Sequence, residues 1–322
     1  MIKTKLLSRT LRSLFITRPY FAHLSVTQRC NLRCKYCQIW KEPVEELDTA
    51  KTKKIIDRLD EMGVAMLSIT GGEPLLRDDI GEIINYANRR GLYVRLTSNG
   101  MLPLAKYKDL LKTKIDGISI SLDGVKGIDT PYSKINPKIL KTIKYIYENK
   151  GKITLSISSV LHKGNQTEIE SIISYVDKHF PGTGVFVQPI VVGTGTLRTN
   201  SQNKVDSKIL YKLKTMDPDF FIKACQDYYK NDRFDWGCKA GKLFFDIKPN
   251  GDFHICQDFP TKLNILSDDF IERWQKSNFQ KQIDKCSGCT YSCYYLTQES
   301  LRPKNWLGML SMVSKYRKNL KK

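Results

Sequence analysis

The sequence contains no long hydrophobic run and no recognisable export signal. None of its apolar stretches reaches the roughly 18 consecutive residues that a membrane-spanning helix requires. The first residues hold no continuous apolar core and no small-residue cleavage site, so they do not match a secretory signal peptide. Internal repeats and low-complexity stretches are also missing. These absences predict a cytoplasmic location.

Proline and acidic residues are both scarce. Only 12 prolines occur in 322 residues and 41% of the residues are hydrophobic, which favours a folded chain with one large α/β domain and a smaller domain. Lys and Arg total 53 against 33 Asp and Glu, a formal net charge of +20. This excess is compatible with nucleic acid, an anionic membrane surface or a phosphorylated substrate, and also with lysines that are simply solvated.

Three of the nine cysteines lie within eight residues. Cys30, Cys34 and Cys37 have the spacing Cys-x3-Cys-x2-Cys. In a protein without an export signal, clustered cysteines indicate metal ligands rather than disulfides. Zinc usually takes four protein ligands, or three and a water, and no histidine lies close by in the sequence. Three thiolates on a 4Fe–4S cluster would leave one iron open for a further ligand. A zinc knuckle and a chance spacing are the alternatives.

From residue 21 onward the hydrophobic pattern alternates between strand and helix periodicity. The expected strands cover residues 21–27, 65–70, 92–97, 117–122, 153–160 and 185–190. The expected helices cover residues 49–62, 79–90, 104–112, 137–149 and 167–179. Short connections between them predict an α/β fold with a parallel sheet and outer helices. A doubly wound sheet is the second choice, because no G-x-G-x-x-G follows the first strand.

Polar and glycine-rich residues follow the expected strands, at the end where parallel barrels carry their active sites. Gly71 and Gly72 remove side chains and let the backbone approach a ligand, and Glu73 adds a carboxylate. An ordinary Gly-Gly turn is the alternative. Further polar groups that could bind a ribose or a carboxylate, or could simply form turns, are Ser98, Asn99, Ser121 and Asp123.

The octet from Cys30 to Cys37 resembles the signature of the radical S-adenosylmethionine (SAM) superfamily. The resemblance covers residues 21 to about 295 and implies a partial (β/α)6 barrel of the TIM type over residues 21–195. It implies a 4Fe–4S cluster on Cys30, Cys34 and Cys37, bound SAM, and a reductant such as flavodoxin or ferredoxin. Reductive cleavage of SAM would release a 5′-deoxyadenosyl radical that abstracts a substrate hydrogen.

The same resemblance implies which residues bind SAM. The Gly-Gly-Glu-Pro segment, Gly71–Pro74, would contact the amino group of the ligand, and Tyr36 would lie beside the adenine. Polar strand ends would contact the ribose or the carboxylate. The full set that the resemblance implies is Tyr36, Gly71, Gly72, Glu73, Pro74, Ser98, Asn99, Ser121, Asp123, Pro189 and Val191.

A second group of cysteines follows a helical connector, residues 196–230, in which Cys225 is expected to be a buried core thiol. Two short strands around Asn250-Gly251 predict a hairpin. The cysteines of this region are Cys238, Cys256, Cys286, Cys289 and Cys293. Their pattern over residues 231–300 resembles the SPASM/twitch extension of radical SAM enzymes. That implies a small α+β iron–sulfur domain whose one auxiliary 4Fe–4S cluster is held by Cys238, Cys256 and two of the other three. A zinc ribbon is the alternative.

Both ends of the chain, residues 1–20 and 301–322, are basic and amphipathic. Each could pack on the domain or contact an anionic membrane surface. The substrate is expected to be a lipid, a lipid-linked or small molecule, or a peptide, with maturation of a ribosomal peptide or protein as the alternative function. A non-catalytic zinc or iron–sulfur module that binds nucleic acid is a third hypothesis. The segment Gly71–Pro74 speaks against it, so no nucleic-acid partner is expected.

Overall fold

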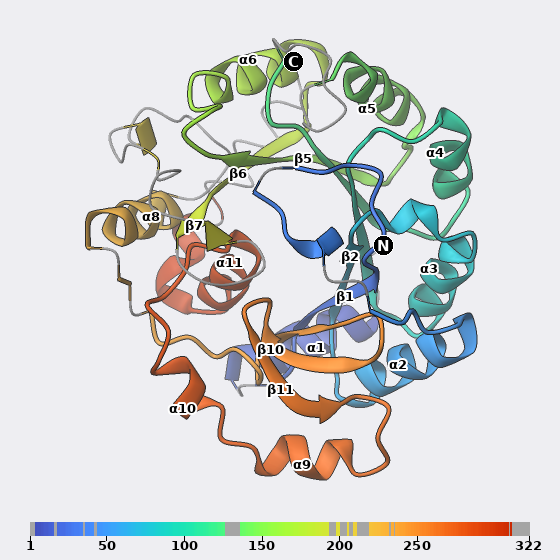
Figure 1. Cartoon of the computed structure of the whole chain (residues 1–322), viewed down its shortest axis with the longest axis vertical. Helices are drawn as coiled ribbons and strands as arrows, with labels where there is room; N and C mark the ends of the chain where they lie inside the picture. The colour runs from blue at the N-terminus through green and yellow to red at the C-terminus, as the bar shows by residue number, and fades with distance from the viewer. Residues whose placement is uncertain are drawn as a thin grey trace.

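A curved nine-stranded sheet forms the body of the protein in the computed structural model, with strand order β11-β10-β9-β1-β2-β3-β4-β5-β6. Figure 1 looks into the curve of the sheet and shows helices α2 to α6 around its outside. The predicted α/β partial barrel is therefore confirmed. The structure describes residues 4–15, 18–34, 36–41, 44–125, 136–192, 198–199, 205, 209–210, 219–231, 233–234, 236–308 and 310.

The element boundaries agree closely with the sequence pattern. The strands are β1 (Phe21–Thr27), β2 (Met66–Gly71), β3 (Tyr93–Ser98), β4 (Gly117–Ser121), β5 (Thr154–Leu161), β6 (Gly184–Pro189), β7 (Val191–Val192), β8 (Arg198–Thr199), β9 (Phe244–Ile247), β10 (Asp252–Cys256) and β11 (Phe259–Asn264). The helices are α1 (Thr4–Phe15), α2 (Thr49–Glu61), α3 (Ile80–Arg89), α4 (Leu104–Leu111), α5 (Pro137–Asn149), α6 (Ile169–His179), α8 (Asp219–Asn231), α9 (Phe270–Lys276), α10 (Gln280–Ile283) and α11 (Ser292–Ser300). Short 3₁₀ turns cover Ile39–Lys41, Pro74–Leu76 and Pro303–Asn305.

Local sequence determines where several of these helices begin. Asp48 caps α2 by accepting a hydrogen bond from the Lys51 amide at 2.7 Å. Asn136 caps α5 in the same way, and Pro137 fills the first helical position, where its missing N–H has no cost. The apolar faces of these helices then pack on the outer face of the sheet, as at Ile56 of α2, which is fully buried.

The strands alternate between an apolar outer face and a polar inner face. In β1, Ala22 and Leu24 belong to the hydrophobic core, whereas His23 lines a cavity inside the barrel. In β3, Leu96 belongs to the core, whereas Arg95 lines the same cavity. Because side chains alternate along a strand with a period of two, one continuous sheet carries both the outer core and a polar interior.

The C-terminal segment adds its strands to the edge of the same sheet. β9 pairs in parallel with β1, and β10 pairs antiparallel with β9. The predicted hairpin is confirmed, with Gly251 at its turn in a positive φ of 85°. The segments on either side of residue 231, which were expected to be separate domains, therefore share one sheet.

Helix α11 lies at the open side of the barrel, between β6 and the β10 hairpin (Figure 1). The Gln188 side chain on β6 donates to the Thr290 carbonyl and accepts from the Ser292 amide, which ties the start of α11 to the sheet edge. Tyr294 stacks on Phe244 of β9, with ring centroids 4.7 Å apart and planes 12° apart. Because α11 is attached to β6 at one edge of the sheet and to β9 on the other side of the opening, it completes the wall of the barrel.

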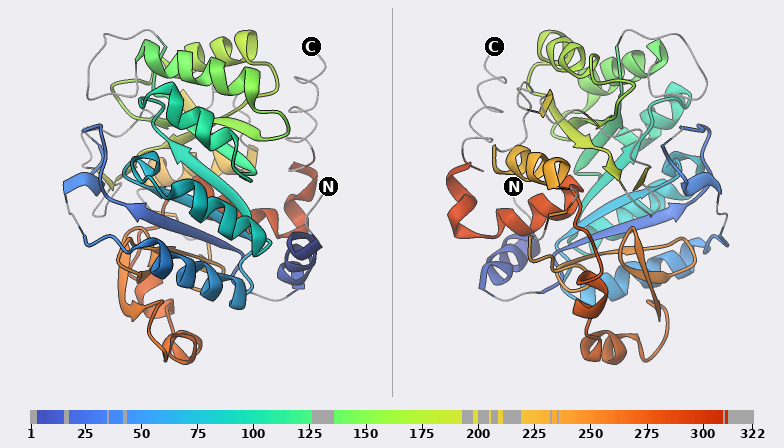
Figure 2. Two further views of the ribbon diagram at one scale, coloured as in Figure 1. Left: turned by 90° about the vertical axis from the view of Figure 1, so that its right-hand side faces the viewer. Right: turned by 60° about the vertical axis from the view of Figure 1, so that its left-hand side comes forward.

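Helix α1 packs against the loops at the amino ends of β2 and β3. Arg9 donates to the Val64 carbonyl at 2.6 Å and pairs with Asp60, which also pairs with Lys5. This result confirms packing on the domain, while Leu11 and Phe15 remain exposed on the helix. Figure 2 shows α1 beside the end of α11 in both of its views. Residues 311–322 of the expected C-terminal helix lie outside the described part.

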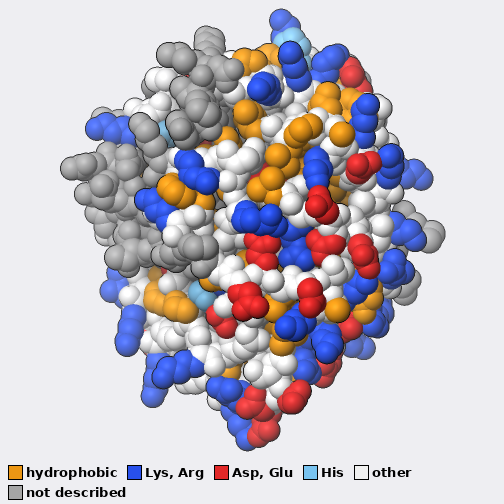
Figure 3. Space-filling model, turned by 45° about the vertical axis from the view of Figure 1, so that its right-hand side comes forward, with side chains coloured by type: hydrophobic (Ala, Val, Ile, Leu, Met, Phe, Trp, Pro, Cys, Tyr) orange, Lys and Arg blue, Asp and Glu red, His pale blue; other side chains and the backbone are white. Residues whose placement is uncertain are grey.

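The described helices include none that is long and apolar enough to span a membrane. On the face shown in Figure 3, basic side chains are interspersed with acidic ones and do not gather into a single patch. On this face, then, the positive charges are distributed over the surface.

Candidate active site

A cavity of about 380 Å³ occupies the interior of the barrel. The cysteine loop that follows β1 forms part of its wall, and Cys30, Cys34 and Cys37 all line it. Strand ends from around the barrel line it too, including Asn99 after β3 and Ser121 on β4. The motif that dominates the sequence therefore faces the carboxyl end of the parallel sheet, where barrel enzymes carry their chemistry.

The Gly71-Gly72 pair holds the cysteine loop against β2. The Gly72 amide donates to the Thr27 carbonyl at 2.8 Å, and the Glu73 amide donates to the Arg29 carbonyl at 2.8 Å. A Cβ on Gly71 or Gly72 would lie 2.1 Å from the same two carbonyl oxygens, which no side chain tolerates. Both glycines also line the cavity. They thus permit close approach of two backbone segments beside the ligand space.

Two N–H groups point at the sulfur of Cys30. The Leu32 amide lies 3.4 Å from it, and the side-chain amide of Asn99 lies 3.9 Å away. Asn99 is held in turn by Asn31, whose Oδ1 accepts at 2.7 Å, and by Glu73, whose Oε2 accepts from the Asn99 backbone at 2.7 Å. Hydrogen bonds to a cysteine sulfur stabilise its thiolate form and tune a bound iron–sulfur cluster.

Tyr36 connects the cysteine loop to the ends of β4 and β5. Its hydroxyl donates to Asp123, whose other carboxylate oxygen accepts from the Val160 amide at 2.9 Å. Burial raises the pKa of the Tyr36 hydroxyl well above its usual range, and the nearby Asp123 carboxylate raises it further. Tyr36 therefore remains a neutral donor, and its ring lies 5.5 Å from that of His162.

The structure brings together most, but not all, of the residues expected to bind SAM. Those that line the cavity are Tyr36, Gly71, Gly72, Ser98, Asn99 and Ser121. Those that are not among its lining residues are Glu73, Pro74, Asp123, Pro189 and Val191. The buried Glu73 carboxylate accepts hydrogen bonds from the backbone amides of Leu75 and Asn99. It therefore holds the backbone next to the cavity in place without lining the cavity itself.

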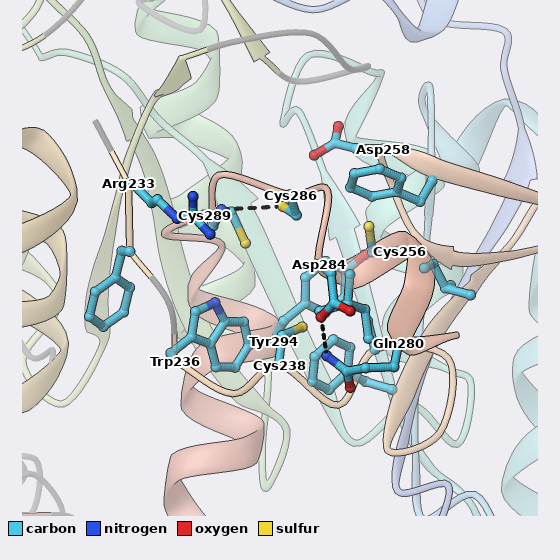
Figure 4. A pocket seen from close by; sticks show the side chains of 17 residues that line it. Arg233, Trp236, Cys238, Cys256, Asp258, Gln280, Asp284, Cys286, Cys289 and Tyr294 are labelled. Atoms are coloured by element: carbon cyan, nitrogen blue, oxygen red, sulfur yellow. Dashed lines mark hydrogen bonds between the residues drawn. The ribbon is translucent and has the colours of Figure 1, made fainter. Parts of the chain in front are cut away.

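A second cavity of about 290 Å³ lies beneath the C-terminal hairpin. Cys238, Cys256, Cys286 and Cys289 line it, and Figure 4 shows their sulfur atoms around one space. They come from the loop before β9, the end of β10 and the loop before α11. Burial raises the pKa of the Cys256 thiol well above its usual range, so this group ionises only when a cation compensates its charge.

The loop that carries Cys286 and Cys289 is fixed by Gly288. Its amide lies 3.3 Å from the Cys286 sulfur, and its φ is +86°. A Cβ at this position would lie 1.9 Å from the Phe234 carbonyl oxygen. Only glycine fits this close backbone contact.

Cys293 faces away from these four cysteines. It lines the barrel cavity, whereas Cys286 and Cys289 line the second cavity. Burial raises the pKa of its thiol, and the nearby Asp246 acts in the same direction. Of the ligand sets that the sequence left open, the cavity lining favours the one with Cys286 and Cys289.

The cysteines around the two cavities are candidate ligands of metal centres. No three His, Cys, Asp or Glu side chains of the described residues are close enough to hold one metal ion. Zinc bonds to sulfur are about 2.3 Å long, so four zinc thiolates must lie within about 4 Å of each other. A 4Fe–4S cube carries each thiolate on a separate iron corner and spaces them more widely. Four cysteines line each cavity: Cys30, Cys34, Cys37 and Cys293 line the barrel cavity, and Cys238, Cys256, Cys286 and Cys289 line the second one.

Sequence reasoning missed several residues of the barrel cavity. His23, Arg95, Trp40 and Gln188 all line it. The strand alternation carried a signal for the first two, because each is a polar residue between two core residues of a strand. Gln188 carries the same signal, because it lies between buried Val187 and Pro189 on β6, whereas no comparable signal marks Trp40, which lies in a short 3₁₀ turn.

Comparison with protein families identifies the part of the chain that holds the cysteine loop. Residues 24–176, from β1 to α6, match the family model of the Radical SAM superfamily. Residues 24–176 form a radical SAM domain. The match supports a radical SAM enzyme, and this family implies a 4Fe–4S cluster and SAM.

Known proteins resemble this chain around the radical SAM domain. A PqqA peptide cyclase from Bradyrhizobium diazoefficiens is 32% identical over 166 residues, which cover 48% of this chain and 42% of that protein. The chain spans less than half the length of such curated relatives. Streptococcus suis SuiB bound to SAM shares the fold with a TM-score of 0.67 at 18% identity, covering 87% of this chain and 71% of that one. The structure of anSMEcpe with AdoMet and the Cp18Cys peptide has a TM-score of 0.58 at 14% identity, covering 93% and 99% of the two chains.

Proposed function

We propose that this protein is a radical SAM enzyme that modifies a peptide, with a second 4Fe–4S cluster beside the barrel. The observation that carries the proposal is the barrel cavity lined by Cys30, Cys34 and Cys37 together with Gly71 and Gly72. When bound there, a reduced 4Fe–4S cluster and SAM supply a 5′-deoxyadenosyl radical that abstracts a hydrogen atom from the substrate.

The residues of the chain have distinct roles in this proposal. Cys30, Cys34 and Cys37 hold the catalytic cluster, and the amides of Leu32 and Asn99 hydrogen-bond to the Cys30 sulfur. The Gly71-Gly72 backbone and the polar strand ends bind SAM. Glu73 is a positioning residue, because its carboxylate fixes the Asn99 backbone. The enclosing wall keeps water away from the reacting groups.

The second cluster is held by Cys238, Cys256, Cys286 and Cys289. Support comes from the cavity that these four cysteines share. Tyr294 of α11 lines the second cavity. Its ring also contacts that of His23 in the barrel, with the two ring centroids 5.7 Å apart. A cluster there would lie next to the barrel, in a position to exchange electrons with the substrate.

A peptide is the favoured substrate class. The matched relatives include a PqqA peptide cyclase, and the fold resembles that of SuiB, which has been solved bound to the precursor peptide SuiA. Lipid and small-molecule substrates, the first expectation from the amphipathic ends of the chain, have less support. The partner peptide would be encoded by a short reading frame near the gene.

Anaerobic SAM cleavage tests the catalytic assignment. Reconstituted protein with dithionite is expected to form 5′-deoxyadenosine and methionine, and Cys34→Ala to form neither, because a three-thiolate site has no spare ligand. Cys225→Ala is the matched control: this cysteine is buried in α8 and lines neither cavity, so cleavage should persist. Cleavage by the Cys34 variant would refute the assignment.

Co-expression tests the substrate class. The protein, together with the product of a neighbouring short reading frame, should change the mass of that peptide, and the change should disappear with Cys34→Ala. An unchanged peptide, together with Cys34-dependent changes in the lipid or metabolite extract of the same cells, would reject a peptide in favour of those classes.

A further inference from the structure

Three strands place a row of polar side chains deep in the barrel. The parallel register aligns His23 on β1 with Ser68 on β2, and Ser68 with Arg95 on β3. All three side chains line the barrel cavity. Strands rise about 3.3 Å per residue, so Arg95 lies roughly 10 Å along β3 from Ser98 at the strand end. Only the layer of Phe21 and Met66 lies closer to the amino ends of these strands in the cavity lining, and the row is called the floor below.

Arg95 brings an uncompensated positive charge to this floor. It is the one Lys, Arg, Asp or Glu among the described residues that line the cavity. Its guanidinium donates to the Ser156 hydroxyl at 3.3 Å, and no carboxylate of the described residues pairs with it. An arginine removed from bulk water and left without a counter-ion is costly, so such a group marks a place where an anion is expected.

His23 provides an independent sign of a missing partner. The side chain is buried, and neither ring nitrogen has a hydrogen-bond partner among the described residues. Burial lowers the pKa of His23 to about 3, with help from Arg95 and Lys248, so the ring is neutral and offers one donor and one acceptor. Buried polar groups are nearly always satisfied in folded proteins, which indicates that a ligand completes this site.

We propose that Arg95, His23 and Ser68 bind a carboxylate of the substrate, most simply the side chain of a glutamate or aspartate in the peptide. A single cation matches the single charge of a carboxylate, whereas a phosphate monoester would leave a negative charge uncompensated. The planar guanidinium fork also matches a carboxylate in shape. The inference rests on the proposed function and adds the chemical class of the substrate.

The carboxylate of SAM is not the partner of this floor. SAM belongs at the strand ends, beside Gly71, Gly72 and Asn99, whereas Arg95 lies about three strand residues deeper, roughly 10 Å away. A substrate group held at the floor would place the adjacent part of the peptide between Arg95 and the reacting end of SAM. This arrangement orients the substrate for hydrogen abstraction.

Calorimetry with capped amino acids tests the inference on the reconstituted protein with SAM bound. N-acetylglutamate N-methylamide should bind at least tenfold more tightly than N-acetylglutamine N-methylamide, which has the same shape without the charge. Arg95→Met should weaken the glutamate probe by roughly 10- to 100-fold, as for a charge-assisted hydrogen bond, and leave the glutamine probe unaffected. Arg95→Lys should restore part of the difference, because lysine keeps the charge but not the fork.

Two controls keep the result interpretable. Arg89→Met removes an arginine from the exposed surface of α3 and should leave probe binding unchanged. The iron content and unfolding midpoint of Arg95→Met verify that it folds. Probe binding does not require SAM cleavage. A wild-type protein that fails to cleave SAM would therefore refute the proposed function, and the calorimetry would still decide whether the floor binds a carboxylate.

Three outcomes would overturn the proposal. Capped phosphoserine could bind more tightly than capped glutamate in an Arg95-dependent manner, which would assign the floor to a phosphate. The glutamate probe could bind equally to wild type and Arg95→Met, which would remove Arg95 from substrate binding. The Arg95→Met change could weaken SAM as strongly as the glutamate probe, which would assign the arginine to SAM.

Discussion

Cys289 and Cys293 are only four residues apart, yet they line different cavities. Cys289 belongs to the loop that Gly288 fixes against Phe234, whereas Cys293 lies in the first turn of α11. The change from loop to helix between them turns the two side chains toward opposite walls. Spacing along the sequence could therefore name five candidate ligands of the second cluster, but it could not show which four of them bind it.

The iron content of single variants tests this selection. Wild-type protein should contain about eight iron and eight sulfide from two 4Fe–4S clusters. Cys286→Ala should lower both to about four, because it removes a ligand of the second cluster, whereas Cys293→Ala should retain about eight. Metal and sulfide analysis of anaerobically reconstituted protein measures both. A loss of four iron in Cys293→Ala, or stoichiometric zinc in place of iron, would contradict the assignment.

At the scale of elements, periodic segments could be predicted from sequence and α11 could not. The strands and helices of the radical SAM domain have clear apolar periodicity, because each has one face on the core and one on solvent or the cavity. Helix α11 instead buries Tyr294, Tyr295, Gln298 and Glu299 on one face, and two of these four are polar, so its sequence shows no apolar stripe. Its position depends on Gln188 and Phe244, which are distant in sequence.

A single substitution, Gly72→Ala, tests the contact between the cysteine loop and the Gly71-Gly72 turn. Gly72→Ala would place a Cβ 2.1 Å from the Arg29 carbonyl oxygen, so the cysteine loop must move. The variant should lose SAM cleavage and retain about four iron, those of the second cluster. Iron analysis and 5′-deoxyadenosine formation measure the two effects.

Gly81 provides the matched control. It lies in α3, and a Cβ there would be 3.5 Å from the nearest atom, an ordinary contact. Gly81→Ala should therefore retain iron and cleavage and stabilise the protein by up to about 1 kcal/mol through its helix propensity. A Gly72→Ala variant that behaves like Gly81→Ala would show that the loop contact is dispensable.

At the scale of the whole molecule, α1 combines a basic contact to the domain with an exposed apolar face. Lys5 and Arg9 bind Asp60, whereas Leu7, Leu11 and Phe15 are 48%, 50% and 86% exposed. The segment after α11 adds more exposed apolar groups on the same side of the molecule (Figure 2), namely Trp306, Leu307 and Leu310. Sequence periodicity predicted an amphipathic helix, but only the packing of α1 shows which of its faces remains exposed.

Contact of these exposed groups with an anionic membrane surface stays a prediction. Wild-type protein should sediment with anionic vesicles, less so as salt rises, because surface charge attraction is screened over about 10 Å at 0.1 M. Phe15→Ser should weaken sedimentation by roughly 10- to 100-fold, since burying such a side chain contributes about 1.5–3 kcal/mol. Leu104→Ser is the matched control, because Leu104 is 40% exposed but lies on α4, away from α1. Equal effects of the two changes, or wild-type protein that stays in the supernatant, would reject the membrane contact and leave this apolar face to another partner.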